Sequence, residues 1–200
     1  MDKKAMYSLS YGFFVLTAKN ENRDNGCIIN TVTQVTSEPN RITIAVNKNN
    51  LTHDMVLKSG EFNVSVLSRE ASFGVYRLWG FQSGRDVDKV EQIRVCRSDN
   101  GLIYLPEGTN AFLSARVIES RDLETHTLFL ADVTDGAVLS AEESATYSYY
   151  QKYIKPAPTE KKKGFVCTVC GYIYEGDVLP EDFICPVCKH PASDFVPVAG

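Results

Sequence analysis

Four of the six cysteines lie near the C-terminal end of the chain, arranged as two Cys-x-x-Cys pairs. The first pair is Cys167 and Cys170, and the second is Cys185 and Cys188. Each pair can form a tight turn whose two sulfurs face one metal ion, and two such turns complete a tetrahedral site. In a reducing compartment, paired motifs of this kind bind metal instead of forming disulfides. The spacing therefore predicts a metal centre with four thiolate ligands.

The four sulfurs alone do not identify the metal, because a tetrahedral thiolate site suits iron and zinc about equally. The surrounding residues are unusually aromatic and comprise Phe165, Tyr172, Tyr174, Phe183 and Phe195. The strings CTVCGYIY and CPVC resemble rubredoxin, a mononuclear iron electron carrier, and their short spacer is similar to that in the rubredoxin-type tail of rubrerythrin. The resemblance implies one iron ion that cycles between its 2+ and 3+ states. A structural zinc ribbon remains the alternative.

The two cysteine turns differ at the residue that follows each pair. Gly171 follows the first pair and suits the left-handed backbone that such a turn needs. Lys189 follows the second pair, where rubredoxins commonly carry glycine, and we expect about 1–2 kcal/mol of strain there, or a different turn. Because so short a segment cannot build an adequate core, the metal is expected to supply much of its folding free energy.

A change of composition separates this segment from the rest of the chain. The string KPAPTEKKKG, residues 155–164, contains prolines and three consecutive lysines but no large apolar side chain. Fully extended, it would span about 31 Å. We therefore expect three parts: a larger domain over 1–154, a linker over 155–164 and a metal-binding domain over 165–200.

The larger domain has the residue pattern of a β protein. Runs rich in β-branched and aromatic residues, separated by turn signals such as ENRDNG and SEPN, predict strands over 12–19, 27–37, 41–47, 61–68, 111–122 and 127–139. Short helices are expected over 51–60 and just before Gly80, and a third is possible over 145–153. This pattern predicts a mainly β fold, a closed or Greek-key barrel followed by the small metal domain.

Polar residues along one predicted strand could bind the edge of a planar ligand: Asn30, Thr31, Thr33 and Gln34. Where the next strand leads into a helix, Asn49, Asn50 or Thr52 can cap the helix, whose free N–H groups suit a phosphate. Each feature also has an ordinary interpretation, as strand threonines or as an N-cap.

Positive charge accompanies these features. Lys48 lies beside the predicted helix start, and Ser83 and Arg85 flank a glycine turn that suits an anion. An ordinary surface turn remains the alternative for the second of these.

Together, the stretches NGCIINTVTQVTSEPNRITIAVNKNNLTHD, FQSGRDVDK, ETHTLFLADV and SATYSYYQ look like the flavin reductase-like, FMN-binding split barrel, over about residues 5–154. The resemblance implies a homodimer with FMN near the subunit interface. It assigns the flavin ring to the segment from Asn30 to Gln34, and it places His126 near the flavin and the nicotinamide. Around the ribityl phosphate it implies Asn47, Lys48, Asn49, Thr52, Ser83 and Arg85. An ordinary histidine at a strand start remains the alternative for His126.

The order of the domains is similar to that of high-molecular-weight rubredoxins. The resemblance implies electron transfer from NAD(P)H to FMN, from FMN to the iron, and on to a partner such as a flavodiiron oxygen or nitric oxide reductase. A nicotinamide gives up two electrons together, an iron site accepts one, and a flavin can do both. Two alternatives remain: a non-enzymatic electron carrier, or a flavin-binding protein with a structural zinc ribbon.

Charge and hydropathy exclude several other classes. The net charge of −4 argues against nucleic-acid binding, which needs clustered lysine and arginine. No run approaches the roughly 20 apolar residues of a membrane helix, and nothing resembles a secretory signal. We therefore expect a cytoplasmic protein. Cys27 and Cys96 lack a Cys-x-x-Cys partner and are interpreted as small buried apolar residues.

Overall fold

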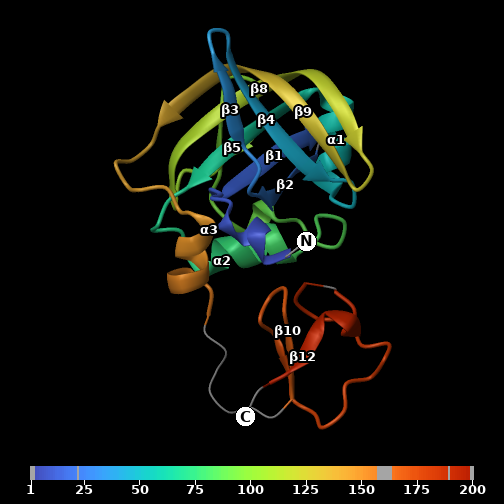
Figure 1. The fold of residues 1–200 in the computed structure, drawn as a ribbon. Coiled ribbons are helices and arrows are strands. Elements are labelled where there is room, and N and C mark those ends of the chain that lie inside the picture. Colours follow the sequence, from blue (N-terminus) through green and yellow to red (C-terminus); the bar gives the residue numbers. More distant parts are fainter. Residues whose placement is uncertain (1–2, 22, 157–163, 189, 199–200) are drawn as a thin grey trace.

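The computed structural model describes residues 3–21, 23–156, 164–188 and 190–198. A larger β domain contains most of the chain, and a small domain follows it at the C-terminal end (Figure 1). Most of the expected linker, residues 157–163, and the expected strain at Lys189 lie outside the described residues.

The larger domain is built on a curved antiparallel sheet (Figure 1). Within the described residues the sheet has seven strands, in the order β2-β1-β5-β8-β9-β4-β3. Their bounds are β1 Phe14–Asn20, β2 Arg23–Ile29, β3 Thr33–Ser37, β4 Asn40–Asn47, β5 Glu61–Leu67, β8 Thr109–Leu123 and β9 His126–Val138. The expected mainly β fold is confirmed, and we refer to the larger domain, with this curved sheet, as the barrel.

Side-chain burial explains why these segments form strands. β4 alternates between buried and less buried positions, with Ile42, Ile44 and Val46 pointing into the core. The central strands β1 and β5 are buried along most of their length, as expected for strands covered on both faces. Phe62 and Phe129, both fully buried, join the same core cluster.

Short helices close one end of this sheet. α1 spans Leu51–Ser59 and ends at Gly60, whose φ of 71° is left-handed and therefore favours glycine. α2 spans Phe73–Tyr76 and continues as a π-helical turn, η2, over Arg77–Phe81. α3, Tyr147–Tyr149, is followed by a second π-helical turn, η4, Tyr150–Ile154.

The remaining elements are short. They are η1 Lys3–Ser8, η3 Val90–Gln92, the β6–β7 pair Cys96–Arg97 and Ile103–Tyr104, and, in the small domain, β10 Phe165–Cys167, β11 Ile173–Tyr174, η5 Ala192–Asp194 and β12 Phe195–Pro197.

Three local expectations were wrong. The expected strand over 27–37 is two strands, β2 and β3, interrupted at residues 30–32. The expected turn ENRDNG belongs mostly to β2, because Asn25 and Gly26 are held by contacts with α1 and Trp79. The second helix runs through Gly80 as the π-helical turn η2, and Gly80 packs there against Ile28, because a Cβ at this position would lie 3.3 Å from Ile28 Cγ1.

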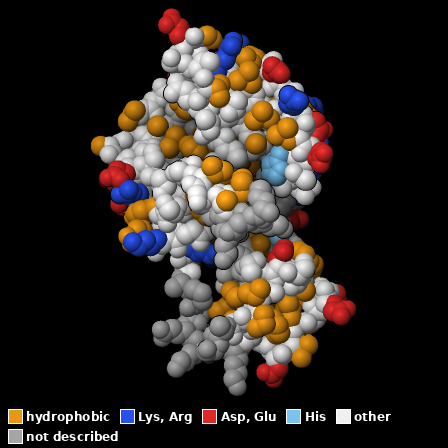
Figure 2. Space-filling view, viewed as in Figure 1, with side chains coloured by type: hydrophobic (Ala, Val, Ile, Leu, Met, Phe, Trp, Pro, Cys, Tyr) orange, Lys and Arg blue, Asp and Glu red, His pale blue; other side chains and the backbone are white. Residues whose placement is uncertain are grey.

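The small domain is a three-stranded sheet in the order β11-β10-β12, with the four cysteines at the centre of its apolar cluster. Aromatic rings cover these cysteines, and Phe183 contacts both Tyr174 and Phe195 with ring centroids 4.7 and 5.4 Å apart. Figure 2 shows acidic and apolar side chains on the visible face of this domain and no basic ones among its described residues.

Within the described residues, no helix has both the length and the apolar character needed to cross a membrane.

Candidate functional site

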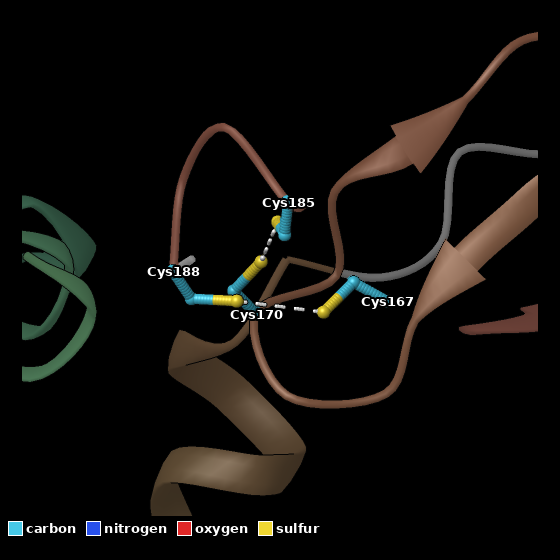
Figure 3. Close-up of side chains that lie close together, drawn as sticks. All are labelled: Cys167, Cys170, Cys185 and Cys188. Carbon is cyan, nitrogen blue, oxygen red and sulfur yellow. Dashed lines mark hydrogen bonds between the residues drawn. The ribbon is translucent and has the colours of Figure 1, made fainter. Parts of the chain in front are cut away.

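The four cysteines of the small domain converge on one point (Figure 3). Their sulfurs all lie within 4.8 Å of one another. Cys167 Sγ is 3.5 Å from Cys188 Sγ, and Cys170 Sγ is 3.5 Å from Cys185 Sγ. Four sulfurs at about 2.3 Å from a central ion would be roughly 3.8 Å apart, so the spacing fits a tetrahedral metal site. None of the four is in a disulfide.

Backbone hydrogen bonds shape the two cysteine turns. The first is closed by Gly171 N, which donates to Cys167 O at 2.9 Å, and Gly171 has a φ of +79°. In the second, Cys185 N donates to His190 O at 2.8 Å. Backbone N–H groups of Val187 and Cys188 donate to the thiol of Cys185. Such N–H donors stabilise thiolate charge and tune the potential of a bound ion.

A pocket of about 210 Å³ lies at the N-terminus of α1, at the end of the larger domain nearest the metal site. Three segments of the larger domain line it: residues 25–28 of β2, residues 49–52 at the start of α1, and residues 79–84 of η2 with the following loop. Lys89 completes this part of the lining. The small domain adds Cys188 and His190 to the lining. The pocket therefore lies between the sheet and the metal centre.

The start of α1 is open to an anionic ligand. Asn50 is the N-cap residue, but its side chain makes no capping hydrogen bond and instead points its Nδ2 at Cys27 Sγ, 3.6 Å away. Asn50 therefore occupies the N-cap position, as expected, but its side chain does not form the capping hydrogen bond that a cap residue usually makes. An uncapped helix start keeps backbone N–H groups available, and the helix dipole favours negative charge there.

Lys89 brings a buried positive charge to the same pocket. Its side chain is only 3% exposed, and Nζ donates to Gly26 O at 2.9 Å and Trp79 O at 3.3 Å. Within the described residues it forms no salt bridge with a carboxylate. Burial lowers the pKa of Lys89 to about 8. A buried ammonium without a counter-charge favours the arrival of an anion.

Other features of the pocket fit a phosphate-bearing flavin. Trp79 Nε1 and Gln82 Oε1 are buried and have no hydrogen-bond partner among the residues that the structure describes, which is unusual for protein interiors. Gly84 packs tightly against the lining, because a Cβ there would lie 2.0 Å from Asn25 Oδ1. The pocket thus combines free helix N–H groups and one cation, which suit a phosphate, with an unpaired donor and an unpaired acceptor, which suit a polar ligand edge.

The structure brings three of the sequence-predicted flavin residues into this pocket, namely Asn49, Thr52 and Ser83. Thr52 is fully buried, and its Oγ1 accepts a hydrogen bond from Asn25 Nδ2 at 2.9 Å. Ser83 Oγ accepts from Arg85 N at 3.1 Å and so shapes the loop that borders the pocket.

The residues expected to contact the flavin ring lie elsewhere. Thr31 Oγ1 donates a hydrogen bond to Ala45 O at 2.8 Å. Thr33 and Gln34 lie on the exposed strand β3, and Asn30 lines a separate cavity with Tyr11 and Tyr147. Within the described residues of this chain, these side chains do not meet the pocket at α1.

The remaining predicted residues, Asn47, Lys48, Arg85 and His126, are not among those that line the pocket. Asn47 pairs with His126 across β4 and β9, and its Oδ1 accepts a hydrogen bond from Asn49 N. His126 Nδ1 lies 2.9 Å from Thr125 Oγ1. Lys48 and Arg85 are held in ion pairs, with Asp122 at 2.6 Å and Asp54 at 2.8 Å.

Several pocket residues were not predicted from the sequence. Lys89 lies in the quoted string FQSGRDVDK, but no local pattern indicates that it is buried. Asn25 and Gly26 were assigned to a turn. Cys27 is buried as expected and lines the pocket, whereas Cys96 is only partly buried.

Comparison with known families agrees with this two-domain arrangement. The description "Flavin reductase like domain" matches residues 6–158, and "Rubrerythrin, rubredoxin-like domain" matches residues 165–196. The chain belongs to the flavin reductase like family, and it carries a rubredoxin-like domain behind the flavin reductase domain.

Among curated proteins, the chain is 39% identical to the high molecular weight rubredoxin of Moorella thermoacetica, over 94% of this chain and 96% of that protein. It is 35% identical to a ferric-chelate reductase (NAD(P)H) of Archaeoglobus fulgidus, over 75% of this chain and 89% of that protein.

Solved structures share the fold. An NADH:FAD oxidoreductase of Streptomyces globisporus superposes with a TM-score of 0.65 at 21% identity, over 74% of this chain and 87% of that chain. An FMN-binding protein of Thermus thermophilus superposes with a TM-score of 0.61 at 23% identity, over 66% and 73% of the two chains.

Proposed function

We propose that this protein is an electron-transfer oxidoreductase that takes electrons from NAD(P)H into FMN, passes them to one iron ion in the four-cysteine site, and delivers them to another protein. The observation that carries the proposal is the position of Cys188, which lines the same pocket as the open start of α1 and the buried Lys89. When bound, FMN accepts an electron pair and releases electrons singly, and an iron ion in four thiolates exchanges one electron.

The residues of the chain bind and orient these groups. The N–H groups at the start of α1 and the Lys89 ammonium would hold the flavin phosphate, with Asn49, Thr52 and Ser83 beside it. The aromatic residues around the cysteines would exclude water from the iron, which limits solvent access and shapes its potential. Family resemblance further suggests that His126 lies near the nicotinamide.

The ring-binding segment suggests a homodimer. In the part of the chain that the structure describes, Asn30, Thr31, Thr33 and Gln34 do not reach the α1 pocket, and β3 is an exposed edge strand of the sheet. A second copy could bring such residues to a shared flavin site, as the resemblance implies. Sedimentation of the purified protein, with and without bound flavin, tests this part of the proposal.

The acceptor and the location are also proposals. The acidic surface of the small domain would suit a partner with a basic docking face, and resemblance suggests a flavodiiron oxygen or nitric oxide reductase. A cytoplasmic site agrees with six free cysteines, since thiols persist in a reducing compartment.

The first test is the visible spectrum of the purified protein under anaerobic conditions, before and after NADH or NADPH. We expect flavin absorption overlaid with ferric–thiolate bands, both bleached by one of the two nicotinamides. Iron and flavin that stay oxidised with both donors, yet bleach with dithionite, would leave only an electron carrier reduced by another protein. Zinc in place of iron would remove the electron-transfer function.

A further inference from the structure

The small domain contacts the larger one through the tips of its two cysteine turns. Val169, between the first pair of cysteines, lines a cavity together with Phe13, Tyr76 and Tyr147 of the larger domain. Val187, between the second pair, lines a groove with Arg77 and Val87. Phe81, at the end of η2, packs against the cysteine cluster itself. Both turns therefore face the barrel.

This orientation has a consequence for the metal ligands. Cys170 and Cys188 are the outer ligands, 7% and 9% exposed, whereas Cys167 and Cys185 are 1% and 0% exposed. Cys188 lines the α1 pocket. Cys170 directly follows Val169, which lines a cavity together with Tyr150 of the larger domain. Both outer ligands thus lie on the side of the metal centre that faces the larger domain.

The small domain itself also covers the metal centre. The aromatic residues of its apolar cluster surround the cysteines, and they are Phe165, Tyr172, Tyr174, Phe183 and Phe195. Because electron transfer weakens steeply with distance, the face that carries Cys170 and Cys188 is the best route to the metal. The same face would be needed for electrons to enter and to leave.

We propose that the described arrangement is a loading state, in which the tips of the two cysteine turns dock the small domain on its own barrel and electrons enter through Cys188. In this state the exchange face is covered, so the small domain must leave the barrel before it can reduce another protein. The inference rests on the proposed function, but the docking contact can be tested separately.

The electron balance requires the small domain to leave the barrel once for each electron that it delivers. One NAD(P)H yields two electrons and one proton, which goes to water, and becomes NAD(P)⁺. Each ferric ion accepts one electron and becomes ferrous. One iron ion must therefore deliver its electron to a one-electron acceptor protein and return for the second, so loading and delivery alternate.

The test uses the full chain with Val169→Gln and Val187→Gln combined. These changes place polar groups in the docking contact without adding charge near the metal. Val178→Gln is the matched control, because Val178 lies in the same small domain but is 76% exposed. A second variant, Val87→Gln, weakens the contact from the barrel side and leaves both cysteine turns intact.

The first readout is amide hydrogen exchange over residues 77–84 and 147–155, the barrel segments that face the small domain. We expect exchange there to rise about tenfold in the double variant and in Val87→Gln, and to stay unchanged in Val178→Gln. Unchanged exchange in both docking variants would overturn the docked state.

The second readout is stopped-flow absorption after mixing with the active nicotinamide. Flavin bleaching should keep its wild-type rate, while reduction of the ferric–thiolate band slows about tenfold in the docking variants. Iron reduction at the wild-type rate despite increased exchange would show that loading does not need this contact. Failure of the nicotinamide to bleach wild-type flavin would instead count against the proposed function, and leave the exchange result valid.

Discussion

Lys89 is the residue on which the flavin pocket most depends electrostatically. It is buried, lies 5.7 Å from the centre of the Trp79 ring, and donates only to backbone oxygens and no carboxylate within the described residues. A buried unpaired charge is costly, and a bound phosphate would remove that cost. The position therefore predicts both an affinity effect and a pH effect.

The Lys89→Met variant should lose affinity for FMN. The substitution keeps much of the side-chain volume and removes the charge, and charge-assisted hydrogen bonds contribute about 1.5–3 kcal/mol, so we expect Kd to rise roughly 10- to 100-fold. Fluorescence titration of the flavin-free protein measures this. Lys58→Met, at an exposed lysine of α1, is the control and should bind FMN normally. Equal affinity in wild type and Lys89→Met would remove Lys89 from the site.

The lowered pKa of Lys89 predicts opposite pH trends for flavin binding and for stability. In the folded flavin-free protein this lysine loses its proton near pH 8, whereas in the unfolded chain it keeps the proton to about pH 10.5. Between these values the unfolded state binds more protons, so the free energy of unfolding should increase with pH, by about 1–3 kcal/mol. FMN affinity should decrease over the same range, because the cation is lost.

Urea unfolding and FMN titration from pH 7 to 10 check these two trends. Both should be absent from Lys89→Met, and this difference isolates Lys89 from other groups that titrate in the same range. If Lys89→Met retained the two trends, another group would be responsible.

His126 predicts an effect on rate and little effect on flavin binding. It lies at the start of β9, opposite Asn47 and outside the pocket lining. If it orients the nicotinamide, His126→Ala should slow flavin reduction by NAD(P)H about tenfold while the Kd for FMN changes little. Stopped-flow reduction and FMN titration separate the two quantities. Normal reduction kinetics would leave His126 an ordinary strand residue.

At the scale of elements, the pocket exists because three segments meet: β2, the start of α1 and the loop after η2. Asn25 of β2 bonds Thr52 of α1, and Arg23 of β2 donates to Gly84 O and Val87 O in the loop. Gly84 lets the loop approach β2 closely, since a Cβ would collide with Asn25. The geometry of the pocket thus depends on β2, which forms hydrogen bonds with both α1 and the loop after η2.

The Gly84→Ala variant should disturb this meeting point. The added Cβ would force Asn25 to move and would break its bond to Thr52, so we expect a stability loss of about 1–3 kcal/mol and weaker FMN binding. Gly74→Ala in α2 is the control, because its Cβ would meet only the hydroxyl of Ser72 at 3.3 Å. Urea unfolding and FMN titration measure both effects. A Gly84→Ala protein with wild-type stability would show that the loop can relax.

At the scale of the whole molecule, each of the two domains is stabilised internally by different interactions. The larger domain has two extended apolar clusters of its own. The cluster of the small domain consists of the four cysteines with Phe165, Val169, Tyr172, Tyr174, Leu179, Phe183, Val187 and Phe195, joined by Phe81 of the barrel. Without an ion, the centre of this cluster would contain four thiols and no metal–sulfur bonds.

Metal removal should therefore unfold the small domain and leave the larger one folded. Structural metal sites contribute about 10 kcal/mol or more of binding free energy, which exceeds the stability expected for so small a core. We expect Cys185→Ser to lose the metal and to show rapid amide exchange over 165–198, with protected amides in β1 and β5. Cys96→Ser, outside the metal site, should keep the ion. Simultaneous loss of both domains would show that they fold as one unit.

The sequence alone determined those features that depend on local chemistry. The cysteine spacing and its aromatic neighbours predicted the metal centre, because ligand geometry there is set by two short turns. Alternating apolar residues predicted the main strands, and Gly60 predicted the end of α1, since only glycine readily adopts its left-handed backbone.

Tertiary structure decided what depends on contacts between distant segments. Asn25 and Gly26 have the composition of a turn, yet they are strand residues because α1 and Trp79 hold them. The burial of Lys89 and the uncapped start of α1 follow from packing that no local pattern encodes. The position of the small domain against the barrel, with Cys188 at the pocket, likewise follows from how the surfaces of the two domains fit together, which no local pattern encodes.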